Sequence, residues 1–136
     1  MNNITVKIKK FGNLEESVFL EDTSNNFTIT EDELLINILL FPINPADILL
    51  IEGRYGNKPT LPCLIGSECV AVVNKKGKKV KNIKEGDIVM PITRCNWTSK
   101  KVVHYNEVIK LKIKTNLEQA CMLKINPATA YLMLNN

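Results

Sequence analysis

The chain has 136 residues, of which 45% are hydrophobic and 24% charged, and its formal net charge is +4. This length suits one domain with its own core, and the composition excludes a disordered or fibrous chain. No apolar run is long enough to span a bilayer, and the first residues lack the features of a secretory or transit leader. We therefore expect a cytoplasmic protein with no membrane partner.

The first third of the sequence predicts strands. Residues 4–9 alternate apolar and polar side chains, as in a half-buried strand, and residues 17–20 form a second candidate strand after a turn at Gly12. Residues 33–41 are almost continuously apolar, so their periodicity alone fits a buried strand or a helix equally well. Pro42 ends this run.

A short helix and a glycine-flanked loop follow. Asn44 is a good N-cap, and Pro45 suits the first helical position because the N–H that proline lacks has no helical partner there. Gly53 ends the helix, since glycine adopts the left-handed conformation easily. Tyr55 lies on the next loop, between Gly53 and Gly56. A large aromatic hydroxyl in such a loop favours a functional role over plain packing.

The segment after the β-branched strand at residues 70–73 is rich in lysine, with six lysines from Lys75 to Lys84. Nucleic-acid binding would need aromatic or arginine side chains to stack on bases, and this segment has none. We therefore predict a solvated connection between two strands and no nucleic-acid partner. A weak attraction for phosphate-bearing substrates is compatible with the charge.

The next segments complete the predicted β part. A strand at residues 88–90 follows a Gly-Asp turn, and further strands are predicted at residues 101–105 and 108–111. Residues 94–97 form a loop between them. His104 is the only histidine, and its place in the strand alternation favours a structural or surface role over catalysis.

Two helices are predicted at the end of the sequence. Thr115 and Glu118 have the spacing of a capping box, which predicts a helix from there to about Lys124. The Asn-Pro pair at residues 126–127 begins a second helix. Its apolar residues 132–134 are expected to remain exposed in the isolated chain and to make it prone to association.

The cysteines predict free thiols. No two of them form a C-x-x-C pair, although zinc sites usually contain such close pairs. In a reducing compartment we expect buried, unpaired side chains at Cys63, Cys69, Cys95 and Cys121.

Four segments carry a resemblance to a known family. They are Pro42-Ile43-Asn44-Pro45-Ala46-Asp47, Gly53-Arg54-Tyr55-Gly56, Gly66-Ser67-Glu68 and Ile125-Asn126-Pro127-Ala128-Thr129-Ala130-Tyr131. Together they resemble the N-terminal catalytic, GroES-like domain of the medium-chain dehydrogenase/reductase superfamily. Within its quinone-reductase branch, the sequence is most similar to the mitochondrial-type trans-2-enoyl-CoA/ACP reductases. It departs from their pattern at Cys69, where the family has glycine, and in residues 94–97, where a glycine is lost.

The resemblance implies a mainly β (α+β) fold, a GroES-like, partly open β-barrel with short helices, in which residues 33–41 form a strand. It divides the chain into a catalytic domain, residues 1–125, and the start of a linker helix towards a cofactor-binding domain, residues 126–136. Dinucleotide binding needs a glycine-rich turn, and this sequence has no G-x-G and no glycine after Gly86. We therefore expect the Rossmann cofactor domain to be absent and the enzyme to be truncated or split.

In this family the reaction reduces the trans-2 double bond of an acyl-CoA or acyl-carrier-protein thioester with NADPH, as part of fatty-acid metabolism. Tyr55 matches the residue that protonates the α carbon or holds the thioester carbonyl; a phenol, with a reference pKa near 10, carries its proton at neutral pH. Asn126 and Asn44 match positions beside the cofactor, and Trp97 matches a position in the substrate cleft. This chain alone is not expected to bind NADPH tightly or to be active.

No zinc is expected. Zinc-dependent relatives have cysteine where Asn44 stands and histidine where Ser67 stands, so both ligands are missing. Two alternatives to the enoyl reductase stay open: a zinc-free NADPH:quinone oxidoreductase, and a non-catalytic remnant or interaction module. The partners that the enzyme readings imply are an enoyl thioester or a quinone, a separate chain carrying the cofactor domain, and a second copy in a homo-oligomer.

Overall fold

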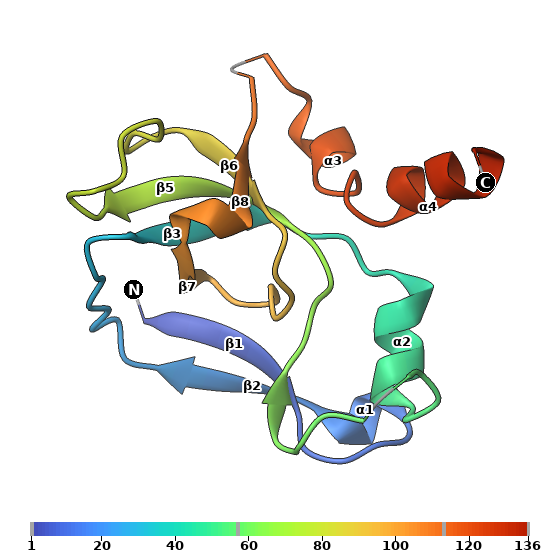
Figure 1. The fold of residues 1–136 in the computed structure, drawn as a ribbon. Helices are drawn as coiled ribbons and strands as arrows, with labels where there is room; N and C mark the ends of the chain where they lie inside the picture. The colour runs from blue at the N-terminus through green and yellow to red at the C-terminus, as the bar shows by residue number, and fades with distance from the viewer. Residues whose placement is uncertain (1, 57, 113, 136) are drawn as a thin grey trace.

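The computed structural model describes residues 2–56, 58–112 and 114–135. Two antiparallel sheets form the body of the molecule, and short helices lie at their ends (Figure 1). In chain order the elements are β1 (Asn3–Ile8), α1 (Leu14–Ser17), β2 (Val18–Thr23), β3 (Glu33–Leu40), α2 (Pro45–Ile51), β4 (Cys63–Leu64), β5 (Val70–Lys76), β6 (Ile88–Pro91), β7 (Lys100–His104), the 3-10 helix η1 (Tyr105–Glu107), β8 (Val108–Lys110), α3 (Leu117–Ala120) and α4 (Asn126–Leu134).

The two sheets form a partly open barrel. One has three strands in the order β2-β1-β4, and the other has five in the order β7-β3-β5-β6-β8. They are joined where Thr5 of β1 forms an isolated bridge with Thr98, and where Val6 N–H donates to the Trp97 carbonyl at 2.8 Å. The predicted mainly β, partly open fold is confirmed.

Strand β3 is an inner strand of the larger sheet, where it pairs with β5 on one side and with the edge strand β7 on the other. Its residues Leu34, Leu35 and Ile36 are all buried. A strand covered on both faces needs no polar alternation, which explains why the pattern of residues 33–41 did not distinguish a strand from a helix. The strand reading is confirmed.

Two apolar clusters support the sheets. The first lies between strands of the larger sheet and includes Leu34, Val73 and Val89. The second joins the smaller sheet to α2 and contains Ile8, Ile51, Ile65 and Trp97. Helix α2 is therefore fixed to the body of the domain through its last residue, Ile51, which is fully buried.

The predicted helix from residue 115 to about Lys124 is wrong in extent and in its cap. Helix α3 covers only Leu117–Ala120, and its N-cap is Asn116, whose side chain accepts the Gln119 N–H at 3.0 Å. The Thr115 hydroxyl instead donates to the Lys112 carbonyl at 2.7 Å. The α-helical pattern ends after Ala120 because the Met122 and Leu123 N–H groups donate to carbonyls only three residues back, at Gln119 and Ala120. The Ile125 N–H then donates to the Glu68 side chain instead of to a helical carbonyl.

Helix α4 is confirmed where the Asn-Pro pair predicted it, and it contains no buried residue. It projects away from both sheets (Figure 1). Its apolar side chains are open to solvent, as expected, with Leu134 84% exposed. Across the described ranges, every helix is too short or too polar to traverse a lipid bilayer.

Candidate active-site cleft

Helix α2 begins as its sequence predicts. Pro45 occupies the first turn, and the Asp47 carboxylate accepts the backbone N–H of the N-cap, Asn44, at 3.0 Å. Gly53 ends the helix with φ +73°, a conformation that glycine adopts without strain. These local signals fix the position of the Asn44 side chain at the edge of the domain.

A hydrogen-bonded chain of polar groups connects this edge to the start of α4. The Asn126 amide donates to Asn44 Oδ1 at 3.4 Å, and the Asn44 amide donates to Glu68 Oε1 at 2.9 Å. The second oxygen of Glu68 accepts the Ile125 N–H at 3.0 Å. Glu68 is fully buried, and its carboxylate is satisfied by these two donors. The structure thus brings together the two residues predicted to contact a cofactor.

A second buried carboxylate lies beside this chain. The Ser67 hydroxyl donates to Asp47 Oδ1 at 2.6 Å. The two positions at which zinc-dependent relatives have ligands are therefore an amide, Asn44, and a hydroxyl, Ser67, each engaged with a carboxylate. Zinc in proteins prefers thiolate, imidazole and carboxylate ligands. Within the described ranges no three His, Cys, Asp or Glu side chains cluster as a metal site would require.

Lys124 connects three segments of this region. Its ammonium group donates to the backbone carbonyls of Ser67, Ile92 and Thr93, the last two at 3.2 and 3.0 Å. Burial lowers the pKa of Lys124, while the nearby Glu68 carboxylate opposes that shift. Because Lys124 and Ile125 are both held in this way, the chain enters α4 in a defined direction.

Lys101 holds the neighbouring loop from the opposite side. Its ammonium group donates to Thr93 Oγ1 at 3.1 Å, to the Arg94 carbonyl at 2.8 Å and to Asn96 Oδ1 at 3.1 Å. Burial lowers the pKa of Lys101 as well. In the same loop Cys95 has φ +65°, a left-handed conformation that is strained for a residue with a side chain.

A small cavity of about 140 Å³ opens between α2 and this loop. Its walls include Asp47, Leu50 and Ser67 on one side and Arg94 and Cys95 on the other. The cavity is therefore adjacent to the Ser67–Asp47 pair. Its volume is below the usual range for small-molecule sites, so this cavity can enclose only part of a ligand.

Tyr55 lies on the predicted loop between Gly53 and Gly56, and its side chain is 38% exposed. Within the described ranges its hydroxyl forms no hydrogen bond, and Tyr55 does not line the small cavity. The side chain is thus accessible to a ligand, but the structure does not bring it into contact with Asn44 or Asn126.

Trp97 is a buried packing residue in this structure. Its ring stacks on Phe41, with centroids 5.5 Å apart, and it presses against Gly66, where an added Cβ would lie 2.4 Å from Trp97 Cδ1. It borders a separate apolar groove of about 480 Å³ beside Phe41 and Leu39. The structure therefore separates Trp97 from the cavity at Asp47 and Ser67, and its predicted place in a substrate cleft stays a prediction.

Three residues of the cleft were given no role from the sequence: Glu68, Lys101 and Lys124. Glu68 had a detectable signal, because it is the one charged residue between Ile65 and Val70, and a carboxylate in an apolar run needs buried partners. The two lysines gave no such signal, since their acceptors are uncharged backbone carbonyls and side-chain oxygens, 5 to 57 residues away in the chain.

The cysteines differ in their exposure to solvent, and the one histidine has a structural role. Cys69 and Cys121 are buried as expected, but Cys95 is exposed, which corrects the prediction for that thiol. Burial raises the pKa of Cys69 to about 12. His104 has the predicted structural role, because its Nδ1 accepts the Asn106 N–H at 3.2 Å and caps η1.

Residues 30–114 match the family model of the alcohol dehydrogenase GroES-like domain. The mitochondrial enoyl-[acyl-carrier-protein] reductase of Dictyostelium discoideum is 34% identical over 135 residues, which are 97% of this chain and 39% of that protein. The human protein of the same name is 38% identical over 104 residues, 75% of this chain and 28% of its own length. The chain thus spans less than half the length of these relatives.

Solved structures agree with this similarity. The mitochondrial 2-enoyl thioester reductase Etr1p/Etr2p heterodimer from Candida tropicalis matches with a TM-score of 0.86 and 26% identity, over 98% of this chain and 43% of that one. The Etr1p/NADP/crotonyl-CoA complex gives 0.83 and 26% over the same shares. A putative NADPH:quinone reductase from Bacillus thuringiensis gives 0.86 and 26%, over 97% of this chain and 40% of that one.

Proposed function

Because this chain belongs to the alcohol dehydrogenase GroES-like domain family, we propose that residues 1–125 form the catalytic domain of an NADPH-dependent enoyl thioester reductase of fatty-acid metabolism, and that residues 126–136 begin the link to a cofactor-binding domain. The observation that carries the proposal is the hydrogen-bonded chain from Asn126 through Asn44 to Glu68. It gathers at one edge the side chains that the resemblance assigns to the cofactor side.

The residues present are suited to a nicotinamide cofactor. Asn126 is exposed, and its Oδ1 accepts no hydrogen bond from the described part of the chain, so this oxygen is available to a donor on a ligand. NADPH, when bound, supplies a hydride to the β carbon of the enoyl thioester. Asn126 would orient the ligand through its free amide oxygen, with Asn44 and Glu68 holding that amide in place.

Tyr55 completes the proposed chemistry on the substrate side. Hydride addition at the β carbon leaves electron density on the α carbon and on the thioester oxygen. The phenolic hydroxyl of Tyr55, on the loop between Gly53 and Gly56, can donate a proton to the α carbon or a hydrogen bond to the thioester oxygen. The proposal further includes no zinc, because Asn44 and Ser67 offer an amide and a hydroxyl where zinc would need stronger ligands.

A zinc-free quinone reductase is the second candidate function. It is supported by the similarity to the putative NADPH:quinone reductase over 97% of this chain. The partners of either enzyme would be a small-molecule substrate and a second protein chain, for which the Etr1p/Etr2p heterodimer is a precedent among similar structures. We also propose a cytoplasmic location for this chain, although its curated relatives are named as mitochondrial proteins.

The test joins this chain to the cofactor domain of the Dictyostelium discoideum relative and measures turnover of crotonyl-CoA and of a quinone. Tyr55→Phe should lower turnover of the enoyl thioester by roughly 10²–10⁴-fold, the usual effect of removing a positioned acid, with little change in NADPH affinity. Tyr105→Phe removes the same hydroxyl from the 3-10 helix η1, keeps the aromatic ring, and serves as the control. A change below about threefold for Tyr55→Phe would favour the quinone reductase or the non-catalytic reading.

A further inference from the structure

The positive charge of the chain is concentrated in two segments outside the proposed cleft. Residues 75–87 contain six lysines and two acidic residues, and residues 107–114 contain three lysines and one acidic residue. These segments therefore carry a net charge of +6, while the rest of the chain carries −2, which together give the total of +4. The excess positive charge therefore lies on the link between β5 and β6 and on β8 with the residues that follow it.

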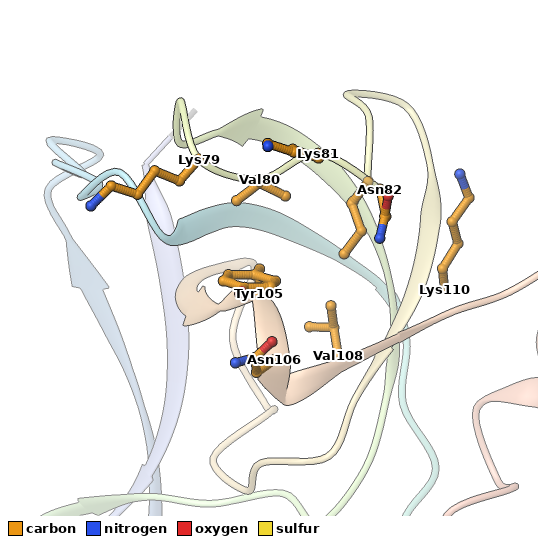
Figure 2. Close-up of a pocket in the computed structure, with 9 residues that line it drawn as sticks. Lys79, Val80, Lys81, Asn82, Tyr105, Asn106, Val108 and Lys110 are labelled. Carbon is orange, nitrogen blue, oxygen red and sulfur yellow. The ribbon is translucent and has the colours of Figure 1, made fainter.

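A hollow of about 670 Å³ lies between these two segments. Figure 2 shows residues 79–82 on one side, with Tyr105, Asn106 and Val108 on the other side and Lys110 at the end. The floor is apolar, because Val80, Tyr105 and Val108 all pack in the cluster beneath the larger sheet. The volume is in the range of small-molecule sites.

The link is held in place before any ligand arrives. Gly77 approaches the chain at Glu31 so closely that an added Cβ would lie 2.2 Å from the Glu31 carbonyl oxygen. Lys79 N–H donates to the same carbonyl at 3.0 Å, and the Lys76 ammonium donates to the Val80 carbonyl at 2.8 Å. The hollow is therefore preformed, which lowers the entropy lost on binding.

The lysines at the rim of the hollow are of two kinds, those paired with a carboxylate and one without such a partner. Lys79 pairs with Glu31 at 3.0 Å, and Lys110 pairs with Asp87 at 2.6 Å, so both ammonium groups are partly neutralised and positioned. Lys81 has no carboxylate within ion-pair distance in the described part of the chain. Its charge is therefore the one most available to an anion.

The remaining lining groups favour an aromatic base. Tyr105 contributes a ring, and the Asn82 and Asn106 amides can donate to and accept from the nitrogen atoms of a heterocycle. Stacking on an aromatic ring and amide contacts to the base edge are the common means by which proteins hold unpaired bases.

We propose that this hollow binds a nucleotide, with the base on Tyr105 and the phosphates on Lys81. The site shares no residue with the cleft at Asn44 and Glu68 and does not depend on the function proposed above. Because the hollow is open and two of its lysines are already paired, the expected Kd for ATP is on the order of 0.1–1 mM.

The test uses calorimetry on the 136-residue chain with ATP, adenosine and inorganic tripolyphosphate as probes. ATP should bind more tightly than either fragment. Lys81→Gln should weaken ATP and tripolyphosphate binding by roughly fivefold to tenfold, as expected for the loss of one charge-assisted contact. Lys9→Gln removes an equal charge from β1's end, far from the hollow in sequence, and should leave both affinities within twofold.

The second variant separates the base from the phosphates. Tyr105→Leu keeps an apolar floor and removes the ring, and it should weaken ATP binding by roughly fivefold or more without changing tripolyphosphate binding, because only the stacking contact is lost. Unfolding curves verify that each variant is folded. Equal affinity for ATP and tripolyphosphate, or equal losses in Lys81→Gln and Lys9→Gln, would show attraction by net charge alone and overturn the proposal.

Discussion

Helices α2 and α4 both start at an Asn-Pro pair, but they relate to the domain differently. Asn44 is the N-cap of α2, whereas Asn126 is the first residue of α4, whose N-cap is Ile125. Helix α2 buries Asp47 and Ile51, and Ile51 packs with Ile8, Ile65 and Trp97. Helix α4 buries no residue, and polar contacts of Lys124, Ile125 and Asn126 attach its first turn to the body.

The comparison separates two kinds of information in a sequence. What the two helix starts share is a proline in the first turn, where its fixed φ suits a helix and its missing N–H has no helical partner, and this signal is local. Whether the helix packs depends on residues far away in the chain. We therefore expect substitutions in α2 to change global stability, and substitutions in α4 to change mainly association and local order.

The largest difference is expected at the last apolar residues of the two helices. Ile51→Ala should lower the free energy of unfolding by about 2–4 kcal/mol, because it leaves a cavity in a fully buried cluster. Leu134→Ala should change it by less than about 0.5 kcal/mol and should reduce self-association, since Leu134 is exposed. Urea unfolding and sedimentation measure both quantities, and equal destabilisation by the two variants would contradict the comparison.

The attachment of α4 should depend on Lys124. Lys124→Met keeps much of the apolar stem and leaves the carbonyls of Ser67, Ile92 and Thr93 without this donor, so we expect a loss of about 1–3 kcal/mol. Hydrogen exchange in residues 126–134 should accelerate more than exchange in α2. Lys78→Met, at an exposed lysine of the β5–β6 link, is the control; similar exchange rates in both variants would show that Lys124 does not hold the helix.

The segment just before β5, which carries Glu68 and Cys69, should also respond to pH. Burial raises the pKa of Cys69 from 9.0 to about 12, so the folded state retains its proton at pH values where the unfolded state has lost it. The resulting stability is complete below pH 9 and declines above it, by about 1.4 kcal/mol at pH 10. Cys69→Ala should lack this part of the decline, whereas Cys95→Ala, which removes an exposed thiol, should retain it. Unfolding curves at pH 8 and pH 10 provide the measurement.

The smallest effect is expected in the loop that Lys101 and Lys124 hold. Cys95→Gly relieves the left-handed strain at φ +65°, and we expect a gain of about 0.5–1 kcal/mol after the greater flexibility of glycine in the unfolded state is included. Thermal unfolding should show a small increase in Tm. A decrease would mean that contacts of the Cys95 side chain outweigh the strain.

The sequence correctly predicted the structural features that depend on residues close together in the chain. The starts of α2 and α4, the Gly53 stop and the strand at residues 70–73 all appear where local patterns indicated them. The family motifs added the strand reading of residues 33–41, which periodicity left open. These features follow from backbone preferences that act over a few residues.

The candidate cleft was less predictable because its contacts are long-range. The bond between Asn126 and Asn44 joins residues 82 positions apart, and Lys124 reaches the Ser67 carbonyl across 57 positions. A long-range bond also contributes to the error in α3, since the Ile125 N–H donates to Glu68, 57 positions away, and not to a helical carbonyl. Trp97 differs from these residues. The resemblance predicted a place for it in the substrate cleft, but its packing against Gly66 and Phe41 is by itself a sufficient reason for a large aromatic side chain at this position.

The buried carboxylate of Glu68 gives the amide chain a direction. A carboxylate only accepts hydrogen bonds, so Asn44 must present its NH₂ to Glu68 and its oxygen to Asn126, and Asn126 must in turn use its NH₂. Neither amide can therefore flip, and Asn126, the last amide of the chain of hydrogen bonds, exposes its oxygen to solvent. The buried Glu68 carboxylate thereby determines, through two successive hydrogen bonds, that the surface at Asn126 selects ligand groups that donate hydrogen bonds.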